Sequence, residues 1–183
     1  MFFIKYLLLL IVSPSEGWKD IGKFSIPNGL LLSKLFHPSL AILSVSLFIP
    51  YLIGYENNSL NNVIIGAMLD FVKYFTAFYV ISYLITMIYK TQFKSVNEIN
   101  ALNNFIVYNL VILVMFNVLR NLMPGFTFFD IFPVYIIYVI YKGVNYLSIP
   151  QNRILGFVSI TALFMIIIPN GIKFVLSILI PNI

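Results

Sequence analysis

Two side chains of opposite charge stand one helical turn apart in the apolar stretch MLDFVKYF. Asp70 and Lys73 have i, i+3 spacing, so they face the same way on a helix. Each charged group in a membrane costs about 2.5–3.5 kcal/mol on insertion scales, and such groups often mark functional sites. We favour an ion pair that neutralises itself inside the protein. The alternative is part of an ion or proton relay, or a groove for a lipid headgroup.

A later apolar stretch carries Asn109, Asn117 and Arg120. Asn117 and Arg120 are also three residues apart and share a helix face. Interhelical amide hydrogen bonds stabilise membrane bundles modestly, by about 0.6 kcal/mol each. We therefore expect the amides to join helices and Arg120 to extend towards water, with Asp130 as a candidate partner for Arg120.

The last apolar stretch is interrupted by IIPNGIKFV. Pro169 removes a backbone hydrogen bond and Gly171 loosens the next turn. We expect a kink or a short final helix with Lys173 reaching the outer surface, although broken helices also build binding sites in transporters. The intramembrane polar candidates are thus Asp70, Lys73, Asn109, Asn117, Arg120 and Lys173.

Catalysis has little support in the residue types present. His37 is the one histidine, and the chain has no cysteine, so no second imidazole or thiol completes a nucleophile–base pair. The carboxylates do not show the spacing of metal ligands. Tyr135, Tyr138 and Tyr141 recur every three residues, as packing residues of one helix face would. The sequence predicts no enzyme, no cofactor and no metal.

The composition requires a membrane. Of 183 residues, 61% are hydrophobic and 9% charged, against about 25% charged residues in a soluble domain. A net charge of +5, dispersed along the chain, argues against a nucleic-acid partner. We predict an all-α membrane protein forming a single domain over residues 1–183, with five membrane-spanning helices, since each needs about 20 apolar residues. They cover about 35–55, 63–89, 104–123, 126–148 and 154–180.

The segment 1–33 is predicted to lie on the membrane surface. MFFIKYLLLLIV is too short to cross, and a cleaved signal peptide or a re-entrant segment is the alternative. Ser13 followed by Pro14 and Glu16 is typical of a helix start. An indole, Trp18, beside lysines then indicates an amphipathic interfacial helix.

The distribution of basic residues predicts the orientation. Eight cations flank the spans on one side: Lys5, Lys19, Lys23, Lys34, Lys90, Lys94, Lys142 and Arg153. Arg120 alone flanks them on the other side. Because cytoplasmic loops carry the excess of Lys and Arg, we predict a cytoplasmic N-terminus and a periplasmic C-terminus in the inner membrane. The residues expected at the lipid interface are Trp18, Lys19, Lys23, Lys34, Lys142 and Arg153.

One turn also carries a family likeness. YVIYKGVNYLSIPQNRILGF resembles the last cytoplasmic turn of the Yip-domain (Ypt/Rab-interacting) membrane proteins, in particular their bacterial branch. An aromatic-x-x-Tyr-x-Gly pattern ends a helix, a proline follows, and a basic residue opens the last span. The matching positions are Tyr138, Tyr141, Gly143, Pro150 and Arg153.

Two other segments are similar to the same family. SPSEGWKDI, with Pro14 and Trp18, resembles its amphipathic opening, and KLFHPSLAILSVSLFIPYLIG, with Pro38, resembles its first span. The likeness extends over nearly the whole chain and implies five spans with the N-terminus inside. The spans here contain Ile, Phe and Tyr where the family favours Gly and Ala, and the N-terminal segment is short, so no GTPase partner is inferred.

Two functions remain in view. The resemblance implies a non-enzymatic scaffold or accessory subunit that binds other integral membrane proteins, with anionic phospholipid at its basic surface. The alternative is a small transporter, channel or lipid-moving protein that uses Asp70, Lys73, Arg120 and Lys173. Water at Asp70 would favour transport, whereas a dry, paired Asp70 would favour the scaffold.

Overall fold

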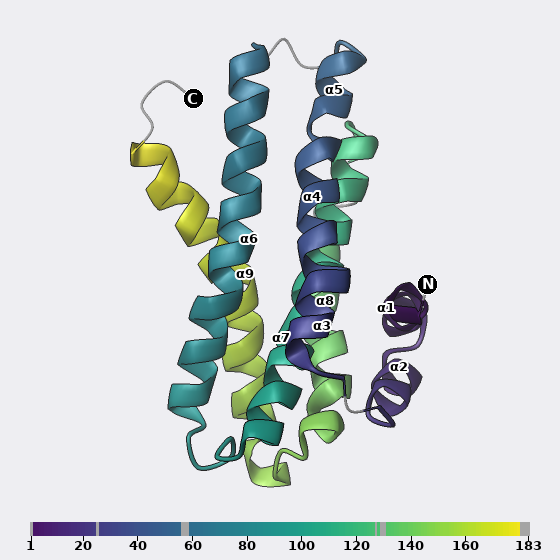
Figure 1. Cartoon of the computed structure of the whole chain (residues 1–183), viewed down its shortest axis with the longest axis vertical. Coiled ribbons are helices and arrows are strands. Elements are labelled where there is room, and N and C mark those ends of the chain that lie inside the picture. Colours follow the sequence, from purple (N-terminus) through teal and green to yellow (C-terminus); the bar gives the residue numbers. More distant parts are fainter. Residues whose placement is uncertain (1, 25, 56–58, 127, 129–130, 180–183) are drawn as a thin grey trace.

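The computed structural model describes residues 2–24, 26–55, 59–126, 128 and 131–179 (Figure 1). These residues form helices and connecting turns, with no strand among them. The helices are α1 (Phe2–Val12), α2 (Pro14–Ile21), α3 (Asn28–Leu31), the π-helix η1 (Leu32–Phe36), α4 (His37–Ser46), α5 (Phe48–Leu52), α6 (Leu60–Ile88), α7 (Val96–Leu122), α8 (Phe132–Gly143), the 3-10 helices η3 (Val144–Leu147) and η4 (Gln151–Arg153), and α9 (Ile154–Leu179).

Four helical stretches of the described chain are long and apolar enough to cross a membrane. They are Asn28–Leu52, Leu60–Ile88, Val96–Leu122 and Gln151–Leu179. With 25 to 29 residues, they extend for about 38–44 Å, which exceeds the ~30 Å hydrocarbon core of a bilayer. Four of the five predicted spans therefore have a matching helix, and the chain is a multi-pass, all-helical membrane protein.

The structure does not confirm the predicted span at 126–148. Its helix α8 has 12 residues, a length of about 18 Å, and η3 follows it directly. Pro133 lies in the first turn of α8, where its missing N–H costs nothing and its fixed φ favours a helix start. The residues before this proline are also largely apolar. The predicted span, which depends on hydropathy alone, therefore begins at residue 126, before the start of α8.

The N-terminal segment forms the two short helices α1 and α2, which pack against each other and, through α2, against α8. Figure 1 shows α1 almost end-on, so it runs across the long helices rather than along them. A Cβ on Gly17 would lie 2.8 Å from Leu10 Cδ2 and 2.9 Å from the Leu10 backbone nitrogen. Only glycine permits this close approach of the two helices.

Helix α7 forms the centre of the bundle. It contacts α4, α6 and α8, and every residue from Asn104 to Val114 is buried. A helix that is apolar on all sides is expected to be enclosed by others. Its start is fixed by a capping box, in which the Ser95 hydroxyl accepts from the Glu98 N–H while the Glu98 carboxylate accepts from the Ser95 N–H.

Helix α9 continues through Pro169, so the predicted short final helix does not form. Figure 1 shows its last turns leaning away from α6, as a proline inside a helix can cause. Lys173, four residues after this proline, still reaches α6, where its Nζ lies 2.9 Å from Asp70 Oδ1 instead of extending alone to the outer surface.

Candidate functional site

Three charged side chains join α6 to α9 and are called the Asp70 cluster here. Asp70 Oδ1 lies 3.0 Å from Lys73 Nζ on the same helix and 2.9 Å from Lys173 Nζ on α9. The side chains of Asp70 and Lys73 are 8% and 6% exposed, whereas that of Lys173 is 45% exposed. The predicted one-helix ion pair is therefore present, and a second lysine from a distant segment completes it.

Two further predicted residues lie beside this cluster. Lys73, Asn117 and Arg120 line a cavity of about 160 Å³, together with Tyr74. The Asn117 Nδ2 donates to the Tyr74 hydroxyl at 2.6 Å, which joins α7 to α6. Asp130, the predicted partner of Arg120, lies outside the described residues.

The remaining amides connect helices. Asn121 donates to the Ser46 hydroxyl at 2.9 Å, a link between α7 and α4. Asn109 does not join the cluster, because it precedes Asn117 by eight residues, about 12 Å along the helix. Its Nδ2 donates to the carbonyl of Phe105 on its own helix.

The described residues contain no group of three or more His, Asp or Glu side chains that could hold a metal ion. His37 is exposed, and its ring lies near the rings of Phe36 and Phe75.

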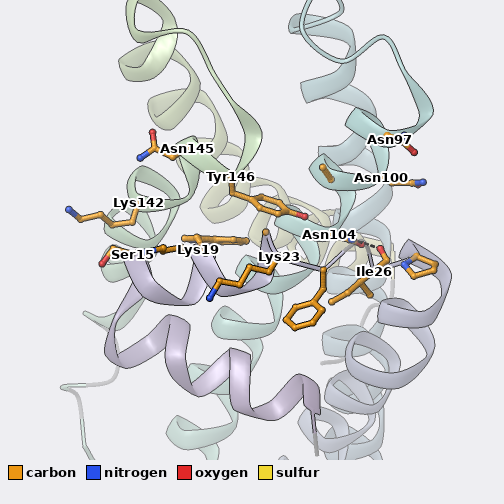
Figure 2. A pocket seen from close by; sticks show the side chains of 15 residues that line it. Ser15, Lys19, Lys23, Ile26, Asn97, Asn100, Asn104, Lys142, Asn145 and Tyr146 are labelled. Carbon is orange, nitrogen blue, oxygen red and sulfur yellow. Dashed lines mark hydrogen bonds between the residues drawn. The ribbon is translucent and has the colours of Figure 1, made fainter.

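A second candidate site is a cavity of about 1020 Å³, called the basic-end cavity here. Figure 2 shows its three walls, formed by α2, by the first turns of α7, and by the end of α8 with η3. The lining side chains that carry polar or charged groups are Ser15, Trp18, Lys19, Lys23, Asn97, Asn100, Asn104, Lys142, Asn145 and Tyr146.

Trp18 is enclosed by protein, although the sequence placed it at the lipid interface. Its indole is 2% exposed and lies between the rings of Phe105, at 4.8 Å, and Tyr146, at 5.3 Å. The indole N–H donates to the Val139 carbonyl at 2.9 Å. A Cβ on Gly143 would lie 2.7 Å from the indole, so glycine is required for the ring to fit against α8.

The other residues predicted at the interface occupy the same end of the bundle in different ways. Lys34 is exposed, and Arg153 donates to the Thr91 hydroxyl at 3.0 Å. Lys23 forms an ion pair with Asp20 at 2.6 Å. This hydrogen bond from the ammonium lowers the pKa of the Asp20 carboxyl below its ordinary value, so the pair is ionised at neutral pH.

Lys142 is half-buried, with its ammonium over the rings of Tyr138 and Tyr141, 5.4 and 5.6 Å from their centroids. Such cation–π contacts hold a lysine head beside aromatic rings. Neither tyrosine lines the basic-end cavity, so this ammonium is held beside the cavity and not inside it. Lys19 is exposed and forms no ion pair with any described residue.

Three asparagines of this cavity are not among the predicted site residues. Asn97, Asn100 and Asn104 follow one another at steps of three and four, which places them on one face of α7 and was a readable signal. Asn104 is 4% exposed, and its Nδ2 donates to the Ile26 carbonyl at 2.7 Å. Its Oδ1 has no hydrogen-bond partner within the described part of the chain.

No protein-family model matches this chain, and neither does any curated protein or solved structure. The resemblance to Yip-domain proteins thus stays a prediction from the motifs. The two sites are interpreted from their geometry.

Proposed function

We propose that this protein is a non-enzymatic scaffold or accessory subunit that binds other integral membrane proteins, as the Yip-like motifs imply. The observation that supports this proposal most is the state of Asp70. A carboxylate that relays protons or ions must exchange partners with water, whereas Asp70 is buried and contacts two lysines of its own chain. The cluster thus acts as an internal connection between α6 and α9.

A partner would contact the outer face of α6. Met68, Val72, Tyr79, Tyr83 and Met87 lie on this face, and each is exposed by 39% or more of its surface. Their spacing in multiples of three and four is that of one helical stripe. Tyrosine hydroxyls gain a hydrogen bond against a protein helix that hydrocarbon chains cannot provide, so this stripe fits a protein partner.

The test combines co-purification with cross-linking. A photo-reactive amino acid at Tyr83 should give a discrete protein adduct in native membranes, and the adduct should contain an integral membrane protein that also co-purifies in gentle detergent without cross-linking. Lipid adducts alone, together with a monodisperse lone chain after purification, would refute the scaffold role.

A second candidate function, transport or movement of lipid, has one observation in its favour. Lys73 and Arg120 both line the cavity of about 160 Å³ beside the Asp70 cluster, so two basic side chains border one polar cavity between the helices. This function predicts flux through reconstituted vesicles that the double variant Lys73→Gln/Arg120→Gln abolishes. Absence of flux in the unaltered protein would leave the scaffold as the function.

We infer an inner-membrane location, with the N-terminus in the cytoplasm and the C-terminus in the periplasm. The support comes from Figure 1, where α2, the connection from α6 to α7, and the segment from the end of α8 to η4 lie towards the lower end of the bundle. These segments, with Lys23 directly after α2, carry six of the eight counted cations. The chain between α7 and α9 returns to that end, so α8 belongs to a fifth crossing in this topology. A protease site inserted at Ser148 should be cut from the cytoplasmic side only.

A further inference from the structure

His37 presents an imidazole at the depth of the hydrocarbon core. It lies nine positions after Asn28, the start of a 25-residue span, so it is about 14 Å along a helix of about 38 Å. With this span centred on a core of about 30 Å, His37 lies about 10 Å inside the core. Its ring is 6.0 Å from that of Phe75, which is one residue from the middle of the 29-residue helix α6. Two helices therefore place it at the same depth.

The imidazole has no polar neighbour within the described part of the chain. It is exposed, and it forms neither a hydrogen bond nor an ion pair with a described residue. Lys34, one turn earlier on the same face, is also exposed and without an ion pair there. A lysine at this depth can extend to the headgroups, whereas an imidazole is too short to do so. Ionisable side chains inside a membrane almost always face protein or water, so His37 calls for a polar neighbour from another molecule.

The backbone beside His37 is irregular at the same depth. The His37 N–H donates to the Leu32 carbonyl, five residues back, which is the hydrogen bond of a π-helix. Pro38 follows and has no N–H, so a carbonyl of the preceding turn lacks its helical donor. Pro38 is exposed as well. Such backbone is tolerated at membrane depth where protein covers it or water reaches it. On the outside of the bundle, a protein neighbour meets this condition and lipid does not.

An apolar groove of about 330 Å³ begins near this turn and is called the α4–α6 groove here. Ser44 of α4 and Phe48 of α5 border it on one side, and α6 borders it on the other. Figure 1 shows α4 and α6 running side by side, and the Ser44 hydroxyl joins them by donating to the Ala67 carbonyl at 3.1 Å. Phe71, a lining residue, stacks on Phe75 with their ring centroids 6.1 Å apart. The groove thus lies one helical turn from the His37–Phe75 contact.

This groove continues the surface to which the proposed function assigns a partner. Met68 and Val72 line the groove and also belong to the exposed stripe of α6. A partner helix on that stripe can place apolar side chains in the groove and pass close to His37. There it meets two groups that donate hydrogen bonds, the imidazole N–H and the Lys34 ammonium. A carboxylate is the side chain that accepts from both donors and also compensates a positive charge.

We propose that the partner presents a membrane-spanning helix to the α4–α6 groove, with an Asp or Glu at the depth of His37. The carboxylate accepts a hydrogen bond from the imidazole and compensates the charge of Lys34. Apolar side chains of the same helix fill the groove. This inference rests on the proposed scaffold role, and it adds the chemistry by which the partner is recognised.

The first experiment maps what occupies the groove. The full-length protein carries a photo-reactive amino acid either at Val72, which lines the groove, or at Leu163, an exposed residue of α9 outside it. After irradiation in native membranes, the cross-linked peptides are sequenced by mass spectrometry. We expect the Val72 adduct to lie in a membrane-spanning segment of another protein, within about two helical turns of an Asp or Glu. Leu163 should give lipid adducts alone.

The second experiment measures how much partner co-purifies in gentle detergent. His37→Phe should lower the recovery about threefold or more, and Lys34→Gln/His37→Phe about tenfold or more, since both donors to the carboxylate are then lost. His37→Gln keeps an N–H donor and should stay within about twofold of wild type. Lys90→Gln, an exposed cation of the α6–α7 connection, is the matched charge control and should have no effect. Replacing the partner's acidic residue by Ala should reproduce the loss seen with His37→Phe.

The outcomes separate this inference from the scaffold role. If Tyr83 gives a protein adduct but the segment at Val72 lacks an acidic residue, or if His37→Phe retains the partner, the acidic helix is refuted and the scaffold role stands. Lipid adducts alone at Val72, or an adduct with a second copy of this chain, refute it in the same way. A fall of more than about 5 °C in the Tm of His37→Phe would also refute it, because the imidazole would then act within the fold. Absence of protein adducts at both Tyr83 and Val72 would refute the scaffold role and this inference together.

Discussion

Asp70 is the residue whose replacement tests the architecture most directly. The change Asp70→Asn removes the carboxylate that contacts both Lys73 and Lys173. Lys73 then keeps a buried, uncompensated charge, because its side chain is 6% exposed. Removing one partner of a buried ion pair costs about 3–5 kcal/mol. Lys173, at 45% exposed, turns to water and adds at most about 1 kcal/mol.

This cost is large enough to measure as a shift in melting temperature. For a chain of this size, 1 kcal/mol lowers Tm by about 2–4 °C, so Asp70→Asn should lower it by on the order of 10 °C. Lys173→Gln is the matched control, since the Asp70–Lys73 pair remains and the expected loss is about 2–4 °C or less. The assay is thermal unfolding in one detergent, followed by helical circular dichroism and by the monodisperse fraction.

The double variant Asp70→Asn/Lys73→Gln gives the decisive comparison. It leaves no uncompensated buried charge, so its Tm should lie closer to wild type than that of Asp70→Asn alone. If the double variant melts at or below the temperature of the single variant, the ion-pair reasoning is wrong. Equal small shifts for Asp70→Asn and Lys173→Gln would show that the cluster does not connect α6 to α9.

Two further variants test local packing. Gly143→Ala should lower the free energy of unfolding by about 1–3 kcal/mol, because the new methyl group displaces the Trp18 indole from α8. The Trp18 emission should then shift to longer wavelength. Gly29→Ala is the control, since its Cβ would meet no atom within 4 Å and the emission should not change. Unchanged emission in Gly143→Ala would contradict the close fit. Ser95→Ala should cost about 1 kcal/mol and speed hydrogen exchange in the first turn of α7, since it removes half of the capping box; exchange at the wild-type rate would count against that cap.

The membrane class and four of the spans could be predicted because they depend on composition within single segments. Hydropathy also predicted a span at 126–148, where the structure describes the 12-residue helix α8 followed by η3. Hydropathy averages over residues and does not register where Pro133 starts a helix. The turn around Gly143 was recognised as a motif, but its reason, the fit of Trp18, depends on α2 packing against α8.

For the polar residues too, contacts within one helix could be predicted from the sequence, whereas contacts between distant segments could not. The Asp70–Lys73 pair is readable because both residues lie on one turn of one helix. Lys173 is 103 positions from Asp70, and only the packing of α6 against α9 brings their atoms to 2.9 Å. The residues that line the basic-end cavity come from three separate segments of the chain. The sequence alone therefore shows that the three asparagines share one face of α7, but not that lysines of other segments lie near them.

The two polar regions differ in what they leave unsatisfied, and this difference assigns them different roles. In the Asp70 cluster each of the three charges has a partner of opposite sign. In the basic-end cavity Lys19 has no ion pair and Asn104 Oδ1 has no donor among the described residues. The ion pairs of the first region therefore stabilise the packing of α6 against α9, whereas the second region has no such pair between its helices in the described part of the chain.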